Sequence, residues 1–148
     1  MKMFSRAFSQ LDSRKWFDRM HPQTLAIATW LLYIDGVFST LGFLDKSNEF
    51  GILRVISPMT GIVGLASCLF MFGSGFLMAN GKRLGWIISV AASFSPFIAR
   101  QLITLSTNYG DTTWVLTGGD TIGFLFDAAL VALLLHSMTQ QYVKRWLR

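Results

Sequence analysis

Four ionisable residues lie inside long apolar stretches of this sequence: Asp35, Arg100, Asp120 and Asp127. If those stretches cross a bilayer, a charge near its centre costs roughly 2.5 to 3.5 kcal/mol on insertion scales, so each of the four needs a partner, a water pocket or neutralisation. Intramembrane carboxylates at such positions suit a proton or cation relay, or a counter-ion for a ligand. The plainer interpretation is a neutral or hydrogen-bonded side chain that faces a neighbouring helix.

Depth along the helices predicts which of these residues meet. At 1.5 Å per residue, Arg100 lies about 24 Å from the inner end of its run, and Asp120 reaches a similar depth. We therefore expect Arg100 and Asp120 to interact, while Asp35 lies near mid-membrane and Asp127 about 9 or 10 Å from the inner side. Two alternatives stay open, because Asp120 also fits a helix N-cap and Arg100 could extend toward outer headgroups.

The elements that would position these residues are four apolar runs. Of the 148 residues, 52% are hydrophobic and only 14% are charged, and the mean hydropathy is +0.46. Each run can cross about 30 Å of hydrocarbon as a helix. We predict an all-α integral membrane protein with four antiparallel transmembrane helices and short loops, a bundle over residues 24–137 with spans near 24–44, 58–79, 84–105 and 113–137. The fourth span is interrupted by Thr117, Gly118, Gly119 and Asp120, so its continuous helix is expected to begin near Asp120.

Charge distribution predicts the orientation. With a cytoplasmic N-terminus, ten of the 13 Lys and Arg residues fall inside, only Lys46 and Arg54 fall outside, and Arg100 lies within a span. The positive-inside rule then places both termini in the cytoplasm, and we expect a bacterial inner membrane. Residues 1–23 form a cytoplasmic or interfacial segment, in which Met3 to Leu11 should be an amphipathic interfacial helix, and residues 138–148 form a basic cytoplasmic tail. The cations gather at the ends of the spans, which favours membrane lipids as partners and no nucleic acid.

Small residues recur on one face of two predicted helices, at Gly61 and Gly64 and again at Gly119 and Gly123. Such stripes allow helix backbones to approach closely, so we expect these glycines to be helix-packing positions. The single cysteine, Cys68, excludes an intrachain disulfide and is expected to be a small buried hydrophobic residue.

The two histidines, His21 and His136, are both expected at the cytoplasmic interface. A haem or metal between them is conceivable, but one histidine precedes a proline at a helix start and the other lies in a last turn, where a cation complements the helix dipole. The sequence contains no catalytic set, phosphate loop or metal-ligand spacing. We therefore predict neither an enzyme nor a metal or other cofactor, and leave open a bound lipid, pigment or quinone.

The turn Gly81-Lys82-Arg83 between two apolar spans resembles turns in small bacterial four-helix membrane proteins, including DoxX-like ones. The resemblance covers about the middle third of the chain and implies the four-helix architecture, but no site residue.

These observations lead to three functional hypotheses. The first is a small non-catalytic integral membrane subunit or accessory factor, which docks on a larger membrane protein complex through small-residue and aromatic helix faces. The second is a small oligomeric proton-linked transporter or channel that uses Asp35 and Asp127. The third is a membrane redox protein, DoxX-like or binding haem or quinone.

Overall fold

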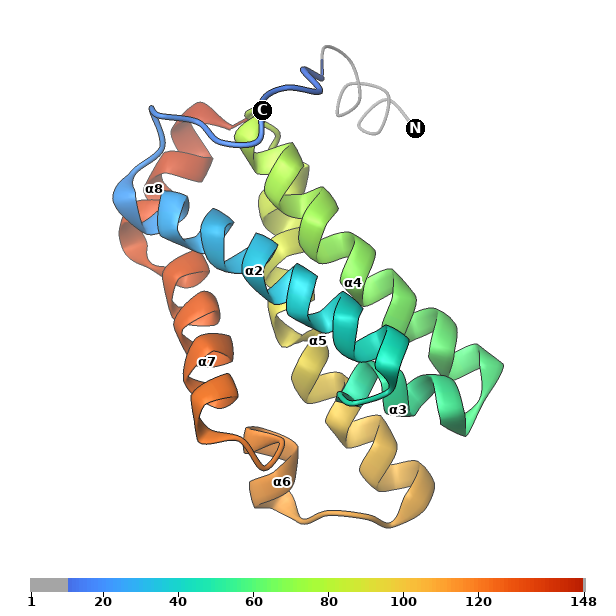
Figure 1. Ribbon diagram of the computed structural model, residues 1–148. Helices are drawn as coiled ribbons and strands as arrows, with labels where there is room; N and C mark the ends of the chain where they lie inside the picture. Colours follow the sequence, from blue (N-terminus) through green and yellow to red (C-terminus); the bar gives the residue numbers. More distant parts are fainter. Residues whose placement is uncertain (1–10, 148) are drawn as a thin grey trace.

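The computed structural model describes residues 11–147, and this part of the chain folds as helices joined by turns (Figure 1). The helices, in chain order, are α2 (Gln23–Asp45), α3 (Glu49–Ile56), α4 (Pro58–Ala79), α5 (Arg83–Thr107), α6 (Thr112–Thr117), α7 (Thr121–Leu135) and α8 (Ser137–Trp146). The expected all-helical architecture is confirmed for the described residues. The predicted helix over Met3 to Leu11 lies almost entirely outside them.

Three helical segments are long and apolar enough to cross a membrane. The first is Gln23–Ile56, which contains α2 and α3, and the other two are α4 and α5. A fourth crossing requires α7 and α8 together, and these two helices are bent by 48° relative to each other. The long helix of the fourth predicted span begins directly after Asp120, as expected. It ends at Leu135, two residues before the predicted end at residue 137. The predicted tail contains α8, which is itself a helix.

The bend between α7 and α8 occurs at His136, whose backbone is extended with ψ 144°. Helix breaks leave backbone carbonyls without helical partners. Side chains supply donors here: Trp86 Nε1 donates to the carbonyl of Leu134 at 3.0 Å, and Thr139 Oγ1 donates to that of Leu133 at 2.8 Å. His136 Nδ1 also accepts from the backbone N–H of Met138, which caps α8. The bend is therefore stabilised by specific polar contacts.

The segment between the first two predicted spans, expected as a short loop, instead folds as α3. Asn48 caps this helix by accepting from the backbone N–H of Gly51 at 2.9 Å. The Asn48 amide also donates to the carbonyl of Ser39 at 3.0 Å, which fastens the start of α3 to α2. Phe50 and Leu53, three residues apart, put their side chains into the core, where both are at most 1% exposed. This spacing buries one face of α3 against the neighbouring helices.

Apolar side chains form two core clusters, one toward each end of the molecule. The first joins α2, α3, α4 and α5 through Phe43, Phe50, Leu53, Cys68, Met71, Ala92, Ala99 and Ile103. The second joins α2, α4 and α7 through Leu25, Ala28, Leu32, Met78, Leu130 and Leu134. Both buried residues of α7, Leu130 and Leu134, lie in its C-terminal half. The N-terminal half of α7 therefore lacks apolar packing of this kind, and this half borders the site described below.

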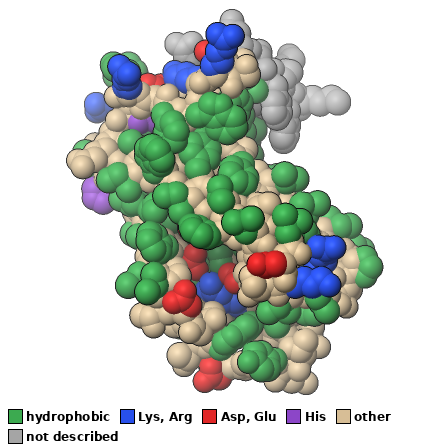
Figure 2. All heavy atoms as spheres, in the orientation of Figure 1, with side chains coloured by type: hydrophobic (Ala, Val, Ile, Leu, Met, Phe, Trp, Pro, Cys, Tyr) green, Lys and Arg blue, Asp and Glu red, His purple; other side chains and the backbone are tan. Residues whose placement is uncertain are grey.

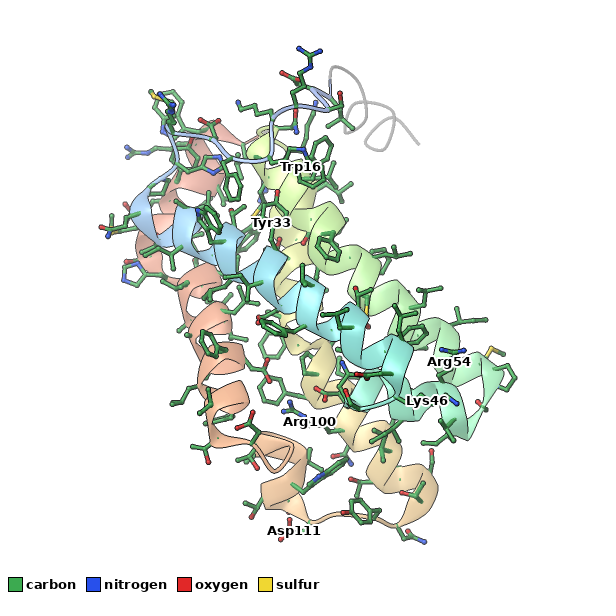
Figure 3. The ribbon with its side chains drawn as sticks, viewed as in Figure 1. Trp16, Tyr33, Lys46, Arg54, Arg100 and Asp111 are labelled. Carbon is green, nitrogen blue, oxygen red and sulfur yellow. The ribbon has the colours of Figure 1, made fainter. Side chains whose placement is uncertain are left out.

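The turn between α4 and α5 lies at the same end of the molecule as both ends of the described chain (Figure 1). Asn80 in this turn is hydrogen-bonded to the segment before α2, because its side chain accepts from the backbone N–H of Asp12 at 2.8 Å and donates to the carbonyl of Lys15 at 3.1 Å. In the same region Tyr33 Oη donates to the carbonyl of Trp16 at 2.8 Å, and the two labelled side chains lie together in Figure 3. The segment before α2 is thus held against the bundle.

Candidate functional site

Arg100 links four helices through its guanidinium group. The residue is only 5% exposed, and its Nη2 lies 3.0 Å from Glu49 Oε1 of α3 and 3.1 Å from Asp127 Oδ2 of α7. Its Nη1 donates to the carbonyl of Leu116 in α6 at 2.9 Å. Figure 3 shows the side chain pointing from α5 into the space beside α7. Because Arg presents several donors in a rigid plane, one side chain can serve three acceptors at once.

The local sequence around Arg100 explains how this position is built. Pro96, one turn earlier in α5, lacks the N–H that would donate to the carbonyl of Ala92. Ser95 Oγ donates to that carbonyl at 2.6 Å, so the helix continues past the proline. On the opposite side, Gly118 ends α6 with φ 65°, and a Cβ there would lie 2.8 Å from Arg100 Nε. A glycine at this position therefore satisfies the turn and leaves room for the guanidinium.

The predicted pairing of Arg100 with Asp120 is wrong, because Arg100 pairs with Asp127 and Glu49 instead. Asp120 is instead the N-cap of α7, the alternative that its sequence position also favours, and its Oδ1 accepts from the backbone N–H of Ile122 at 3.0 Å. Asp127 takes its place because α7 begins only at Thr121, which puts Asp127 about 9 Å from the start of that helix at 1.5 Å per residue. The predicted depths counted residues along one span that starts at residue 113, and the break between α6 and α7 at Gly118 and Gly119 invalidates that count.

The second carboxylate partner, Glu49, is absent from the site predicted from the sequence because its segment was expected to be a loop. Two signals could have identified it. Asn48 is a strong N-cap residue, and an acidic residue in a first helical turn complements the helix dipole. The apolar residues that follow at a spacing of three, Phe50 and Leu53, are typical of a helix with one buried face.

A cavity of about 500 Å³ lies beside the Arg100 cluster, within the range of small-molecule sites. Its lining brings together Asp35, Phe38, Ser39, Ser47, Asn48, Glu49, Met71, Pro96, Arg100, Thr117, Gly118, Asp120, Ile122, Gly123, Phe126 and Asp127. Figure 2 shows the hollow on this face, with acidic and basic side chains at its floor. All four ionisable residues singled out from the sequence therefore meet at one cavity.

Asp35 differs from the other carboxylates of this cavity. Its Oδ2 is buried and has no hydrogen-bond partner among the described residues. Glu49 and Asp127 pair with Arg100, and Asp120 caps a helix. A buried carboxylate oxygen without a donor is costly unless a proton, water or ligand satisfies it. Asp35 is thus the carboxylate of the site whose interactions are incomplete, and on the basic side Arg100 Nε is also buried without a hydrogen-bond partner among the described residues.

The glycines predicted as packing positions divide into two groups. Gly61 and Gly64 are buried on α4 against α3, where an added Cβ would lie 3.1 Å from Arg54 Cα and 2.9 Å from the carbonyl oxygen of Phe50, respectively. Gly119 is exposed in the turn before α7 with φ 79°, and a Cβ at Gly123 would approach the Asp120 side chain at 3.1 Å. The first pair thus lies between two helices, whereas the second pair shapes the start of α7.

The histidines occupy different surroundings. His21 is 9% exposed, its Nε2 lies 3.9 Å from Asp18 Oδ2, and its ring packs edge-on against Tyr142 of α8. Burial lowers the pKa of His21 below its usual 6.5, although the Asp18 carboxylate opposes this shift. His136 is exposed and caps α8. Among the described residues, no group of three or more His, Cys, Asp or Glu side chains could hold a metal ion.

Comparisons with protein-family models, with curated proteins and with solved structures find no match to this chain.

Proposed function

We propose that this protein is a small proton-linked membrane carrier, and that the 500 Å³ cavity is its solute site. The observation that carries the proposal is the meeting of Asp35, Arg100, Asp120 and Asp127 at a single cavity between apolar helices. Ionisable residues at such depth are expensive in a membrane and mark solute, ion or proton pathways.

The proposed arrangement in the membrane follows from hydropathy and charge. The long apolar helices cross a bacterial inner membrane, with both termini in the cytoplasm at the lysine- and arginine-rich end. The α4–α5 turn, which contains Lys82 and Arg83, lies at that same end. The cavity is lined by Glu49 of α3 and by Thr117 and Gly118 at the end of α6, and Figure 1 shows these two helices toward the other end of the bundle. The site then lies in the outer half of the bilayer.

Within this carrier the two acidic positions of the transporter hypothesis have different roles. Asp127 is paired with Arg100 and holds α7 to α5 and α3. Asp35 has an oxygen without a partner, so it is the group that takes up and releases the coupled proton. The uneven packing of α7 supports movement, because its apolar contacts are confined to the half near the bend at His136.

The experiment is a pH step on protein-containing liposomes adsorbed to a sensor that records charge movement. The wild type should give a transient current that empty liposomes lack, and Asp35→Asn should abolish it. Asp12→Asn makes the same change in formal charge at an exposed position near the opposite end and should leave the current intact. Equal currents from wild type and Asp35→Asn would refute the proton role of Asp35.

A second candidate function is the accessory subunit that docks on a larger complex. It is favoured by the α7 half beside the cavity, where Ile122, Leu125 and Phe126 are 66%, 60% and 46% exposed. A helix of a partner subunit placed there would bury these side chains and cover the cavity. Purification in mild detergent followed by mass spectrometry tests this candidate. A stoichiometric integral membrane partner supports it, and a monodisperse chain purified alone contradicts it.

A further inference from the structure

We propose that the cavity binds a bulky organic monocation, an ammonium or phosphonium compound with apolar substituents. This inference rests on the proposed function for its physiological meaning, because it names the solute class of the same cavity. Binding itself can be measured independently of transport.

The charge of the lining favours a cation. Four carboxylates border the cavity, those of Asp35, Glu49, Asp120 and Asp127, against one basic side chain, Arg100. The Arg100 Nη1 and Nη2 atoms are already engaged by the Leu116 carbonyl and two carboxylates, and the remaining Nε, although without a hydrogen-bond partner among the described residues, is buried against Gly118. An anionic solute would thus meet four carboxylates and only one buried guanidinium N–H, whereas a cation gains the attraction of the carboxylates in a medium of low dielectric constant.

Asp35 provides the unfilled position for that cation. Its buried Oδ2 has no donor from the described residues, whereas Glu49, Asp120 and Asp127 each have one carboxylate oxygen that accepts a hydrogen bond. Buried polar atoms left without a partner in a folded protein point to a missing ion, water or ligand. A cation in the cavity would stabilise the Asp35 carboxylate through its charge, and a protonated ammonium group could also donate a hydrogen bond to it.

The apolar part of the lining distinguishes an organic cation from a metal ion. Phe38 and Phe126 border the cavity and are 69% and 46% exposed, and Met71 and Ile122 add further apolar surface. Aromatic faces attract ammonium-type cations and contact their alkyl or aryl groups. Among residues 11–147 no carboxylate group has the arrangement of a metal site. The volume of about 500 Å³ also exceeds what a bare ion requires.

The probe that tests this proposal is tetraphenylphosphonium, with tetraphenylborate as an anion of nearly the same size and shape. Equilibrium dialysis of the detergent-purified full chain should show saturable binding of the cation and no saturable binding of the anion. Asp35→Asn should weaken cation binding at least tenfold, while Asp12→Asn, with the same loss of charge far from the cavity, should bind like the wild type.

Three results would overturn the proposal: no saturable binding of tetraphenylphosphonium, saturable binding of both ions, or unchanged binding in Asp35→Asn. A far-ultraviolet circular dichroism spectrum and a thermal midpoint matching the wild type show that Asp35→Asn is folded. If that variant does not fold, Phe126→Ala serves as the second test, because it removes an exposed aromatic face of the cavity and should also weaken binding. Cation binding without any pH-step current would support this site and contradict only the carrier function.

Discussion

Replacing Arg100 by methionine is expected to lower the free energy of unfolding by about 3–5 kcal/mol, the usual cost of breaking a buried ion pair from one side. The structure explains why the cost falls in this range. The carboxylate side chains left behind, Glu49 and Asp127, are only 18% and 15% exposed. The carbonyl of Leu116 also loses its donor, which contributes about 1–3 kcal/mol if that oxygen stays dry.

The assay is unfolding by a denaturing detergent in mixed micelles, followed by circular dichroism and tryptophan fluorescence. Arg54→Met is the matched control, because Arg54 is exposed and its described contact is a cation–π approach of 5.6 Å to the ring of Phe43. Loss of such an exposed contact should cost about 1 kcal/mol or less. Arg100→Lys should also destabilise, since one ammonium group cannot match the planar geometry that serves two carboxylates and a carbonyl.

A triple variant tests the electrostatic reasoning directly. Neutralising both partners in Arg100→Met/Glu49→Gln/Asp127→Asn removes the stranded charges, so this protein should be more stable than Arg100→Met alone. If the single variant loses less than about 1 kcal/mol, or if neutralising the two carboxylates recovers nothing, the ion-pair explanation is refuted.

Further substitutions and a pH titration test other parts of the fold. Gly118→Ala should destabilise by about 1–3 kcal/mol, because φ is 65° and the added Cβ would crowd Arg100 Nε at 2.8 Å; a thermal midpoint equal to the wild type would contradict this. Gly51→Ala should lower the thermal midpoint, because the added Cβ would lie 2.5 Å from the carbonyl oxygen of Gly42 in α2 and 2.5 Å from Lys46 Cα. Gly73→Ala is its control and should be neutral or stabilising, because an added Cβ there meets no heavy atom within 4 Å. Because burial lowers the pKa of His21 in the fold, its contribution to stability is complete above the unfolded pKa of about 6.5 and declines as the pH falls toward the folded pKa. Thermal midpoints measured from pH 7.5 to 5.0 should fall less steeply for His21→Phe than for the wild type. Parallel curves would show that His21 does not cause the loss of stability at low pH.

Helix positions could be predicted from hydropathy because the long apolar segments are decisive. The predicted boundaries at 58–79 coincide with α4, whose start is marked by Ser57 as N-cap and Pro58 as first residue. The break before α7 was also predictable, since two consecutive glycines precede a capping Asp120. Amphipathic and short helices were harder. The eight residues of α3 make only about two turns, so its N-cap and the spacing of Phe50 and Leu53 are weaker signals than a long apolar run. The bend at His136 depends in part on a side-chain donor from another helix, Trp86 of α5.

Four ionisable residues of the candidate site were predictable from the sequence, but Glu49 and the pairing of Arg100 were not. A charge is conspicuous in a long apolar run, which is why hydropathy alone identifies Asp35, Arg100 and Asp127. Which carboxylate Arg100 meets depends on the depth at which α7 begins and on the folding of α3. Neither follows from counting residues along one continuous helix. Glu49 was missed for this reason, although it supplies one of the two ion pairs.

The proposed water-filled acidic cavity between membrane-spanning helices is tested most directly by the reaction of a single cysteine with a charged, water-soluble thiol reagent in liposomes. In a Cys68→Ser background, Ser39→Cys places a thiol in the lining of the cavity, and Leu69→Cys places one on the exposed apolar surface of α4. A water-filled acidic cavity between membrane-spanning helices predicts fast reaction of the first thiol, faster with a cationic than with an anionic reagent, and no reaction of the second. Equal labelling of both thiols, or labelling of Leu69→Cys alone, would contradict it.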